Sequence, residues 1–194
     1  MMDRPCAPLV VGIGGTTVAG SSTERALAIA LAEAGKQGVE TRMFGGAILA
    51  RLPLYIPNLA ERTSEEAAFI AAIRAASGLI IASPGYHGGV SGLVKNALDL
   101  IEETAGDSRP YCDDLPVGLI ATAYGWQATG STISALRSIV HALRGWPTPF
   151  AAAINSAVCR FDEAGGCSQP AAAEQLERVG RQVAGAVLGR RAAA

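Results

Sequence analysis

Three short segments of the sequence combine glycine with hydroxyl or aromatic side chains, each directly after an apolar run. They are GGTTVAGSST (14–23), SPGYHGGVSG (83–92) and TAYGWQATGS (122–131), called the first, second and third segments below. Hydroxyls and free backbone N–H groups bind anions, and glycine lets the backbone approach a ligand closely. Together the segments predict a binding site for a ligand that has an anionic group and a flat polar ring.

The first segment has the composition of a phosphate site at the start of a helix. Free N–H groups at a helix N-terminus, together with the helix dipole, favour an anion by about 0.3–1 kcal/mol. This chemistry fits a terminal phosphate monoester. The candidate ligands are the hydroxyl residues Thr16, Thr17, Ser21, Ser22 and Thr23.

Other roles for the first segment stay open. Gly12-x-Gly14 begins the dinucleotide fingerprint of Rossmann folds, although Thr17 occupies the position of the third glycine. A Walker phosphate loop is excluded because no Gly-Lys-Ser/Thr occurs. The remaining alternative is a segment whose hydroxyls only cap the following helix.

The second and third segments have residues suited to a flat ring. Their glycines would let main-chain N–H groups approach the ring, while Tyr86 offers an apolar face and His87 a donor. The third segment adds Tyr124 and Trp126. The alternatives are a packed Tyr86, a solvated His87 and, for the third segment, a hydrophobic interface patch.

The elements that position these segments alternate between short apolar strands and amphipathic helices. We expect strands at 8–14, 39–46, 78–83, 115–122 and 149–155. We expect helices at 21–35, opened by the capping-box pattern Ser21-x-x-Glu24, at 64–77 with Ser64 as N-cap, at 91–103, after the third segment through Leu143, and from near Ala171. Residues 45–63, with Pro53 and Pro57, are expected to form a long surface loop.

Continuous apolar strands that alternate with helices predict an α/β fold, a three-layer sandwich of a parallel sheet between helices. Five strands favour the flavodoxin-like order 2-1-3-4-5. We expect one domain over residues 1–194, with flexible termini at 1–6 and 190–194. In such a sheet the ligand crevice lies at the carboxyl ends of the strands, where all three segments begin.

Composition excludes several function classes. The net charge of −1 gives no electrostatic footprint for nucleic acid or an anionic membrane. No apolar run approaches the roughly 20 residues of a membrane span, and no secretory leader is recognisable, so a soluble cytoplasmic protein is expected. The cysteines Cys6, Cys112, Cys159 and Cys167 lack zinc spacing and are expected as free thiols, with no metal site.

The second segment and its helix, SPGYHGGVSGLVKNALDLIEE (83–103), resemble the signature of the NADPH-dependent FMN reductases, a flavodoxin-like family. LPLYIPNLAER (52–62) is similar to that family's Leu-Pro-Leu-Tyr loop. The resemblance extends through residue 155. It implies a homodimer or homotetramer that binds FMN and takes hydride from NADPH or NADH, with reduced flavin passed to a monooxygenase or to a quinone, azo or metal-oxyanion acceptor.

The resemblance also implies roles for the three segments. The first would hold the flavin phosphate through the hydroxyl residues named above. The flavin ring and ribityl chain would be bordered by Pro84, Gly85, Tyr86, His87 and Gly88 on one side, and by Thr122, Ala123, Tyr124 and Gly125 on the other. Many relatives have an arginine near the position of Val18, and this chain has none, so hydroxyls, backbone and dipole alone would hold the phosphate. His87 stands where asparagine is more usual.

The chemistry implied by the resemblance requires no catalytic side chain, because the cofactor itself accepts the hydride. Two other function classes are weighed against it. A flavodoxin-like electron carrier would bind FMN without using nicotinamide, but such carriers are usually strongly acidic. A Rossmann-like dinucleotide module would leave the second and third segments unexplained.

Overall fold

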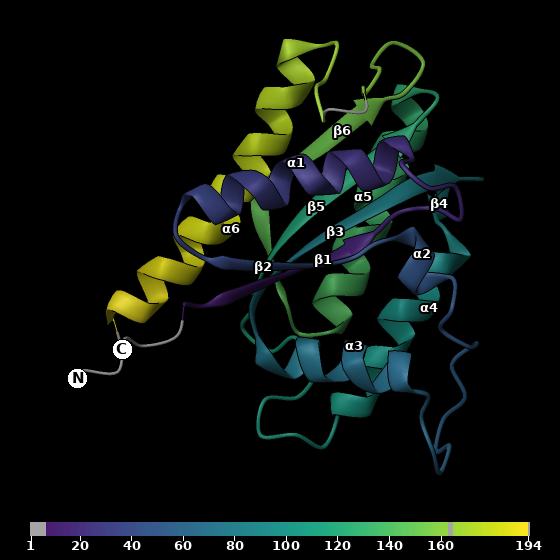
Figure 1. Ribbon diagram of the computed structural model, residues 1–194, viewed down its shortest axis with the longest axis vertical. Coiled ribbons are helices and arrows are strands. Elements are labelled where there is room, and N and C mark those ends of the chain that lie inside the picture. The colour runs from purple at the N-terminus through teal and green to yellow at the C-terminus, as the bar shows by residue number, and fades with distance from the viewer. Residues whose placement is uncertain (1–6, 163–164, 194) are drawn as a thin grey trace.

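The computed structural model describes residues 7–162 and 165–193 as a central parallel sheet between two layers of helices (Figure 1). The sheet has the order β2-β1-β3-β5-β6. Its strands are β1 (Leu9–Gly14), β2 (Glu40–Phe44), β3 (Ala76–Tyr86), β5 (Pro116–Ala123) and β6 (Trp146–Asn155). This is the predicted 2-1-3-4-5 order of a flavodoxin-like fold, because β4 is a short addition to β3. The fold prediction is confirmed.

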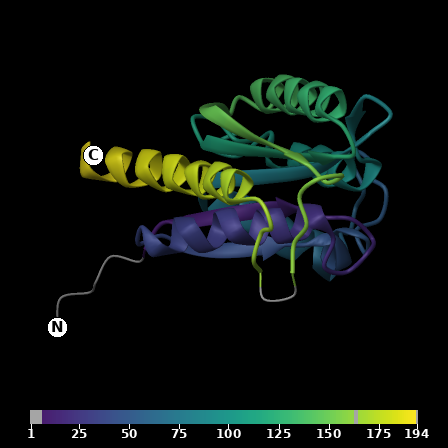
Figure 2. The same ribbon diagram turned by 90° about the horizontal axis from the view of Figure 1, so that it is seen from above.

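The helices cover the two faces of the sheet in separate groups. On one face, α1 (Ser22–Lys36) and α6 (Pro170–Ala193) lie side by side and bury a core with β1, β3 and β5. The other face carries α2 (Gly46–Leu49), α3 (Ser64–Ala75), α4 (Gly92–Asp99) and α5 (Trp126–Ala142) over a second core. Figure 2 shows α5 on the opposite side of the strands from α1. On α6, four apolar residues at helical spacing are buried: Leu176, Val179, Val183 and Val187.

Two boundaries of the predicted elements are wrong in the parts that matter for the site. β3 does not end at Ser83 but continues to Tyr86 and turns back into β4 (Gly89–Val90), so most of the second segment is a hairpin. α5 begins at Trp126, so much of the third segment is helix and not loop. The helix expected at 91–103 is α4 followed by a 3₁₀ turn, η1 (Leu100–Thr104).

The helix caps follow local chemistry, with one correction. Thr63, not the predicted Ser64, caps α3, and its hydroxyl and backbone form a full capping box with Glu66. Ser21 caps α1 as predicted, with its Oγ accepting from the Glu24 N–H at 3.3 Å. The Glu24 carboxylate accepts from Gly20 N–H at 3.0 Å, one residue before the position expected of a capping box.

The ends of the described chain differ in part from expectation. Residues 190–193, expected as a flexible terminus, continue α6 to Ala193, and Arg190 forms an ion pair with Asp114 at 3.0 Å. Residues 1–6 and 194, the rest of the expected flexible termini, lie outside the described residues. None of the helices in the described ranges is long and apolar enough to cross a membrane.

Candidate functional site

The three segments meet at one edge of the sheet, because they follow neighbouring strands. The register places Gly14 of β1 beside Ala82 of β3, and Pro84 of β3 beside Thr122 of β5. The first and third segments are joined directly, since the Thr23 and Thr122 hydroxyl oxygens lie 2.5 Å apart and both side chains are buried. The site predicted from sequence is therefore one place in the fold, at the carboxyl ends of the strands.

The hydroxyls of the first segment are not equally available to a ligand. Thr16 Oγ1 accepts from the Val18 N–H at 3.1 Å, which shapes the turn. Ser21 caps α1, and Thr23 is committed to Thr122. Thr17 is exposed and Ser22 is half-buried. An anion at this helix N-terminus would therefore be met chiefly by backbone N–H groups, by Thr17 and by Ser22.

An arginine that the sequence analysis missed lies against the first segment. Arg25 Nε donates to Gly20 O at 2.7 Å, and Arg25 Nη1 donates to Asp162 O on the loop after β6. The guanidinium thus brings positive charge to the end of the segment, opposed by the Glu24 carboxylate on Gly20 N–H. That hydroxyls, backbone and dipole alone would hold a phosphate stays a prediction, with the Arg25 guanidinium as a further positive group beside them. The sequence signal was an arginine in the first turn of the helix that follows the glycines.

The second segment is a tight hairpin over the start of α4. Ser83 Oγ accepts from the Ser91 N–H at 3.0 Å and so ties the two ends of the hairpin together. Ser91 in turn caps α4, with its Oγ accepting from Val94 N–H at 3.2 Å. Pro84 is buried below the hairpin, while His87 and Tyr86 at its tip are exposed, Tyr86 by 53%. An exposed aromatic at a strand end is available to a ligand.

Gly85 contacts protein rather than open space. A Cβ at this position would lie 2.6 Å from Thr132 Oγ1 and 3.1 Å from both Ala123 Cβ and Ala128 O. The absence of a side chain therefore lets β3 pass directly under α5. Gly85 was predicted to contact a flavin ring, but the close packing of β3 on α5 already requires glycine there.

The third segment presents a helix N-terminus flanked by exposed rings. α5 begins after Gly125, which has no side chain to accept from the first N–H groups of the helix. Tyr124 and Trp126 are 77% and 61% exposed, whereas Thr122 and Ala123 are buried in the end of β5. Large exposed aromatics beside an uncapped helix N-terminus suit a ligand or a partner surface.

Replacing Gly88 with Val tests the second segment. His87 and Gly88 turn the hairpin with φ of 50° and 91°, a left-handed pair that valine adopts only with strain. Because a Cβ at Gly88 meets nothing within 4 Å, strain alone should lower the free energy of unfolding, by about 1–3 kcal/mol. If the hairpin borders a flavin, affinity for FMN should also fall, by about tenfold or more.

A Gly88→Asn variant is the matched control, because asparagine tolerates positive φ. It should keep more of the stability in thermal denaturation, while a fluorescence titration still reports weakened FMN. Unchanged FMN affinity in a folded Gly88→Val variant would contradict a flavin contact at the second segment, which would then only connect β3 to α4.

The predicted long loop at 45–63 contains one helical turn, α2, and then an irregular stretch anchored to α4. Asn96 accepts from the Tyr55 N–H and donates to Pro53 O, both at 2.8 Å. The loop leaves three apolar side chains in solvent: Leu54 is 81%, Ile56 54% and Leu59 44% exposed. Tyr55, between Leu54 and Ile56, is half-buried.

A partly buried ion-pair cluster lies beside that loop. Arg62 contacts Glu66 at 3.1 Å and Glu103 at 2.7 Å, and it donates to Ile56 O at 2.7 Å. Burial opposes ionisation of Glu66, but hydrogen bonds from Thr63 and the Arg62 guanidinium outweigh it and lower the pKa of that carboxyl. The exposed apolar residues are therefore held on a fixed support.

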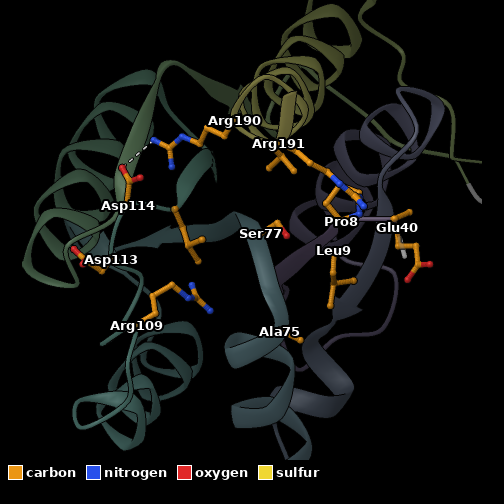
Figure 3. Close-up of a pocket in the computed structure, with 13 residues that line it drawn as sticks. Pro8, Leu9, Glu40, Ala75, Ser77, Arg109, Asp113, Asp114, Arg190 and Arg191 are labelled. Atoms are coloured by element: carbon orange, nitrogen blue, oxygen red, sulfur yellow. Dashed lines mark hydrogen bonds and ion pairs between the residues drawn. The ribbon is translucent and has the colours of Figure 1, made fainter. Parts of the chain in front are cut away.

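A depression of about 690 Å³ lies at the opposite edge of the sheet, among the amino ends of the strands (Figure 3). Its lining includes Arg109, Ser77 and the Arg190–Asp114 ion pair. Arg109 donates to the carbonyls of Ile73 and Arg74 and so caps the end of α3. None of the predicted site residues lines this depression.

Three of the four cysteines lie within the described residues. Cys112, Cys159 and Cys167 are thiols, and Cys6 lies outside the described residues. Over residues 7–162 and 165–193, no group of three or more His, Cys, Asp or Glu side chains is arranged to hold a metal ion.

Comparison with known proteins points to one family. Residues 8–158 match the sequence profile of the family described as NADPH-dependent FMN reductase. An FMN-dependent NADPH-azoreductase of Staphylococcus haemolyticus is 36% identical over 93 residues, which are 48% of this chain and 46% of the relative. The match thus spans less than half the length of that curated relative.

Solved structures show the same fold at low sequence identity. FerB, a flavoenzyme NAD(P)H:(acceptor) oxidoreductase from Paracoccus denitrificans, superposes with a TM-score of 0.76 at 16% identity, over 94% of this chain and 98% of the other. A WrbA-like flavodoxin from Agrobacterium tumefaciens gives 0.62 at 16% identity, over 94% and 99%. At such identity, these likenesses show the fold alone.

Proposed function

The chain belongs to the NADPH-dependent FMN reductase family of oxidoreductases, and from this premise we propose that it binds FMN across the three segments and reduces it with a nicotinamide nucleotide. The observation that carries the proposal is the convergence of the segments at the ends of β1, β3 and β5, joined by the Thr23–Thr122 contact. A crevice at this edge is the usual ligand site of an open parallel sheet.

The residues at this edge offer the charge and the exposed rings that would suit FMN. The start of α1 has the free N–H groups and the Arg25 guanidinium that a phosphate needs. The tips of the second and third segments offer the exposed rings of Tyr86 and Tyr124 for a flat apolar surface. Space is open at Gly88, where a Cβ would meet nothing within 4 Å.

The chain's own contribution to the reaction would be orientation and electrostatics. Bound FMN would supply the ring that accepts a hydride from the nicotinamide. Backbone N–H groups of the second segment and the uncapped N-terminus of α5 would stabilise negative charge at the ring edge. The hairpin strengthened by Ser83 would fix the position of those N–H groups. No side chain is assigned a proton or a covalent bond.

For the final electron acceptor, we propose several chemical classes and not one compound. The names of the staphylococcal relatives make an azo compound one acceptor class. A quinone, a metal oxyanion or a flavin-dependent monooxygenase partner would draw on the same reduced flavin. The exposed Tyr86, Tyr124 and Trp126 leave the mouth of the site open to any of them.

Anaerobic mixing tests the proposal. Protein with equimolar FMN should lose its oxidised flavin absorbance in a stopped-flow instrument when NADPH or NADH is added, many times faster than free FMN does. The two nucleotides are compared separately to establish which is used. Binding of FMN without nicotinamide-dependent bleaching would instead indicate an electron carrier. A failure to bind FMN would contradict the proposal.

Oligomerisation is the prediction attached to the exposed loop. Leu54 and Ile56 form an apolar patch on a rigidly anchored segment, which is typical of a subunit interface. We expect light scattering at micromolar concentration to give the mass of a dimer or tetramer. Leu54→Asp should weaken the assembly by about tenfold or more, since it places a charge in an apolar contact.

The control for this prediction is Ala32→Asp, which changes an exposed position on α1. It should leave the mass unchanged. A monomeric mass for the unmodified chain would contradict the interface.

A further inference from the structure

Two thiols on the loop after β6 lie in contact. Cys159 Sγ and Cys167 Sγ are 3.0 Å apart, about 1 Å beyond a disulfide bond length. Cys159 is 2% exposed and Cys167 is half-buried. Cys112, in contrast, is buried within the core below β5. The pair is therefore distinguished from the other described cysteine by its contact, and Cys167 also by its access to solvent.

The two described backbone segments around the pair, 159–162 and 165–168, pair as the arms of a small hairpin and hold the sulfurs together without a covalent bond. Ser168 N–H donates to Arg160 O at 2.8 Å, and Arg160 N–H donates to Ser168 Oγ at 2.9 Å. Phe161 and Cys167 form an antiparallel bridge, and Cys159 N–H donates to Asn155 O at 2.9 Å. To reach disulfide length the two sulfurs need to approach by about 1 Å.

We propose that Cys159 and Cys167 are a thiol–disulfide site that exchanges with low-molecular-weight disulfides such as glutathione disulfide. Cys167 reacts first because it is the accessible sulfur. As a thiolate, it attacks one glutathione sulfur and releases the other as glutathione. Cys159 then attacks the Cys167 sulfur and releases the second glutathione. The pair loses two protons and two electrons, and the glutathione disulfide gains them.

The order of attack follows from the environment of the two sulfurs. Burial, with the neighbouring Cys167 thiol, raises the pKa of Cys159 to about 12. A thiol protonated in this way is a poor initial nucleophile, and it is also screened from solvent. It becomes effective only against a sulfur already in contact with it, which the mixed disulfide on Cys167 supplies.

The hairpin that holds Cys159 and Cys167 also contacts the first segment, so oxidation of the two cysteines should affect that segment. Arg25 donates both to Asp162 O, within the hairpin, and to Gly20 O, at the end of the first segment. A cross-link between Cys159 and Cys167 limits the freedom of the hairpin and so steadies this bridge. Oxidation should slow amide hydrogen exchange at Gly20 and Ser21 by about threefold or more, with amides of α3 unchanged. Equal rates in the two redox forms would overturn this consequence.

Peptide mapping tests the site itself, because trypsin cleaves after Arg160, between the two cysteines. Reduced protein is incubated with glutathione disulfide, alkylated and digested. We expect peptides 145–160 and 161–178 to be linked with the loss of two hydrogens, and Cys112 to be alkylated only after unfolding. Recovery of Cys159 and Cys167 both as alkylated thiols, or of glutathione on Cys167 without a link, would overturn the proposal.

Two single variants separate the steps. Cys159→Ser should stop at glutathione bound to Cys167. Cys167→Ser should leave Cys159 unmodified, because Cys159 is buried. Equal glutathione incorporation on the remaining cysteine in both variants would contradict the assigned order. The mapping of the unmodified chain decides the proposal even where a variant folds poorly.

Discussion

FMN should bind this protein about a hundredfold more tightly than riboflavin, because two or more charge-assisted hydrogen bonds to the phosphate are each worth about 1.5 kcal/mol or more. Arg25, which donates to Gly20 O, adds a positive charge beside the start of α1. Arg25→Gln should weaken FMN by about tenfold while riboflavin changes by less than about twofold, since only FMN has the phosphate. Fluorescence titration of both flavins measures the two effects.

Arg137→Gln is the matched control for Arg25→Gln. Like Arg25, Arg137 donates to backbone carbonyls, those of Thr148 and Pro149. These carbonyls lie near the start of β6, whereas Arg25 contacts the loop that follows the end of β6. Its replacement should leave both flavin affinities unchanged. Equal affinities for FMN and riboflavin in the unmodified chain would contradict the phosphate assignment to the first segment.

Gly85→Val should lower the free energy of unfolding by about 3 kcal/mol, because overpacking a buried contact forces backbone to move. The new side chain would start 2.6 Å from Thr132 Oγ1, and Thr132 is fully buried. α5 would be pushed away from β3, and the third segment would move with it. FMN affinity should therefore fall by more than about tenfold in whatever fraction stays folded. Chemical denaturation and flavin titration measure the two results.

Gly130→Val serves as the control within the same helix. A Cβ at Gly130 meets nothing within 4 Å, and glycine and valine are both poor helix formers, so stability should change by less than about 0.5 kcal/mol. A Gly85→Val variant as stable as Gly130→Val would contradict the close packing of β3 on α5.

The fold could be predicted from sequence because its strands are continuous apolar runs. β1, β3 and β5 are buried over most of their length, and each runs into a glycine-rich segment at its carboxyl end. The sheet order then places those three ends together without further information. The position of the candidate site could therefore be predicted from the sequence alone.

The details within the site were less accessible, since they depend on contacts between distant segments. The Thr23–Thr122 contact joins residues far apart in the chain, and it removes Thr23 from the free donors. The start of α5 at Trp126 was hidden by Gly130, whose cost in a helix of about 1 kcal/mol is offset by tertiary packing. The contact of Arg25 with Asp162 O depends on the loop after β6, which lies alongside α1 in the fold.

One boundary could have been read from sequence and was not. Thr63-x-x-Glu66 is a capping-box pattern one residue before the assigned Ser64, and the structure forms it completely. The hairpin formed by β3 and β4 could also have been predicted from sequence. His87 and Gly88 both adopt positive φ at its turn, and the apolar residues Tyr86 and Val90 flank the turn.

A crystal structure of the chain with FMN tests the central claim most directly. We expect the phosphate at the start of α1 near Gly20 and Arg25, and the ring between the tips of the second and third segments, beside Tyr86 and Tyr124. FMN bound in the depression lined by Arg109 and Arg190, at the amino ends of the strands, would contradict the account.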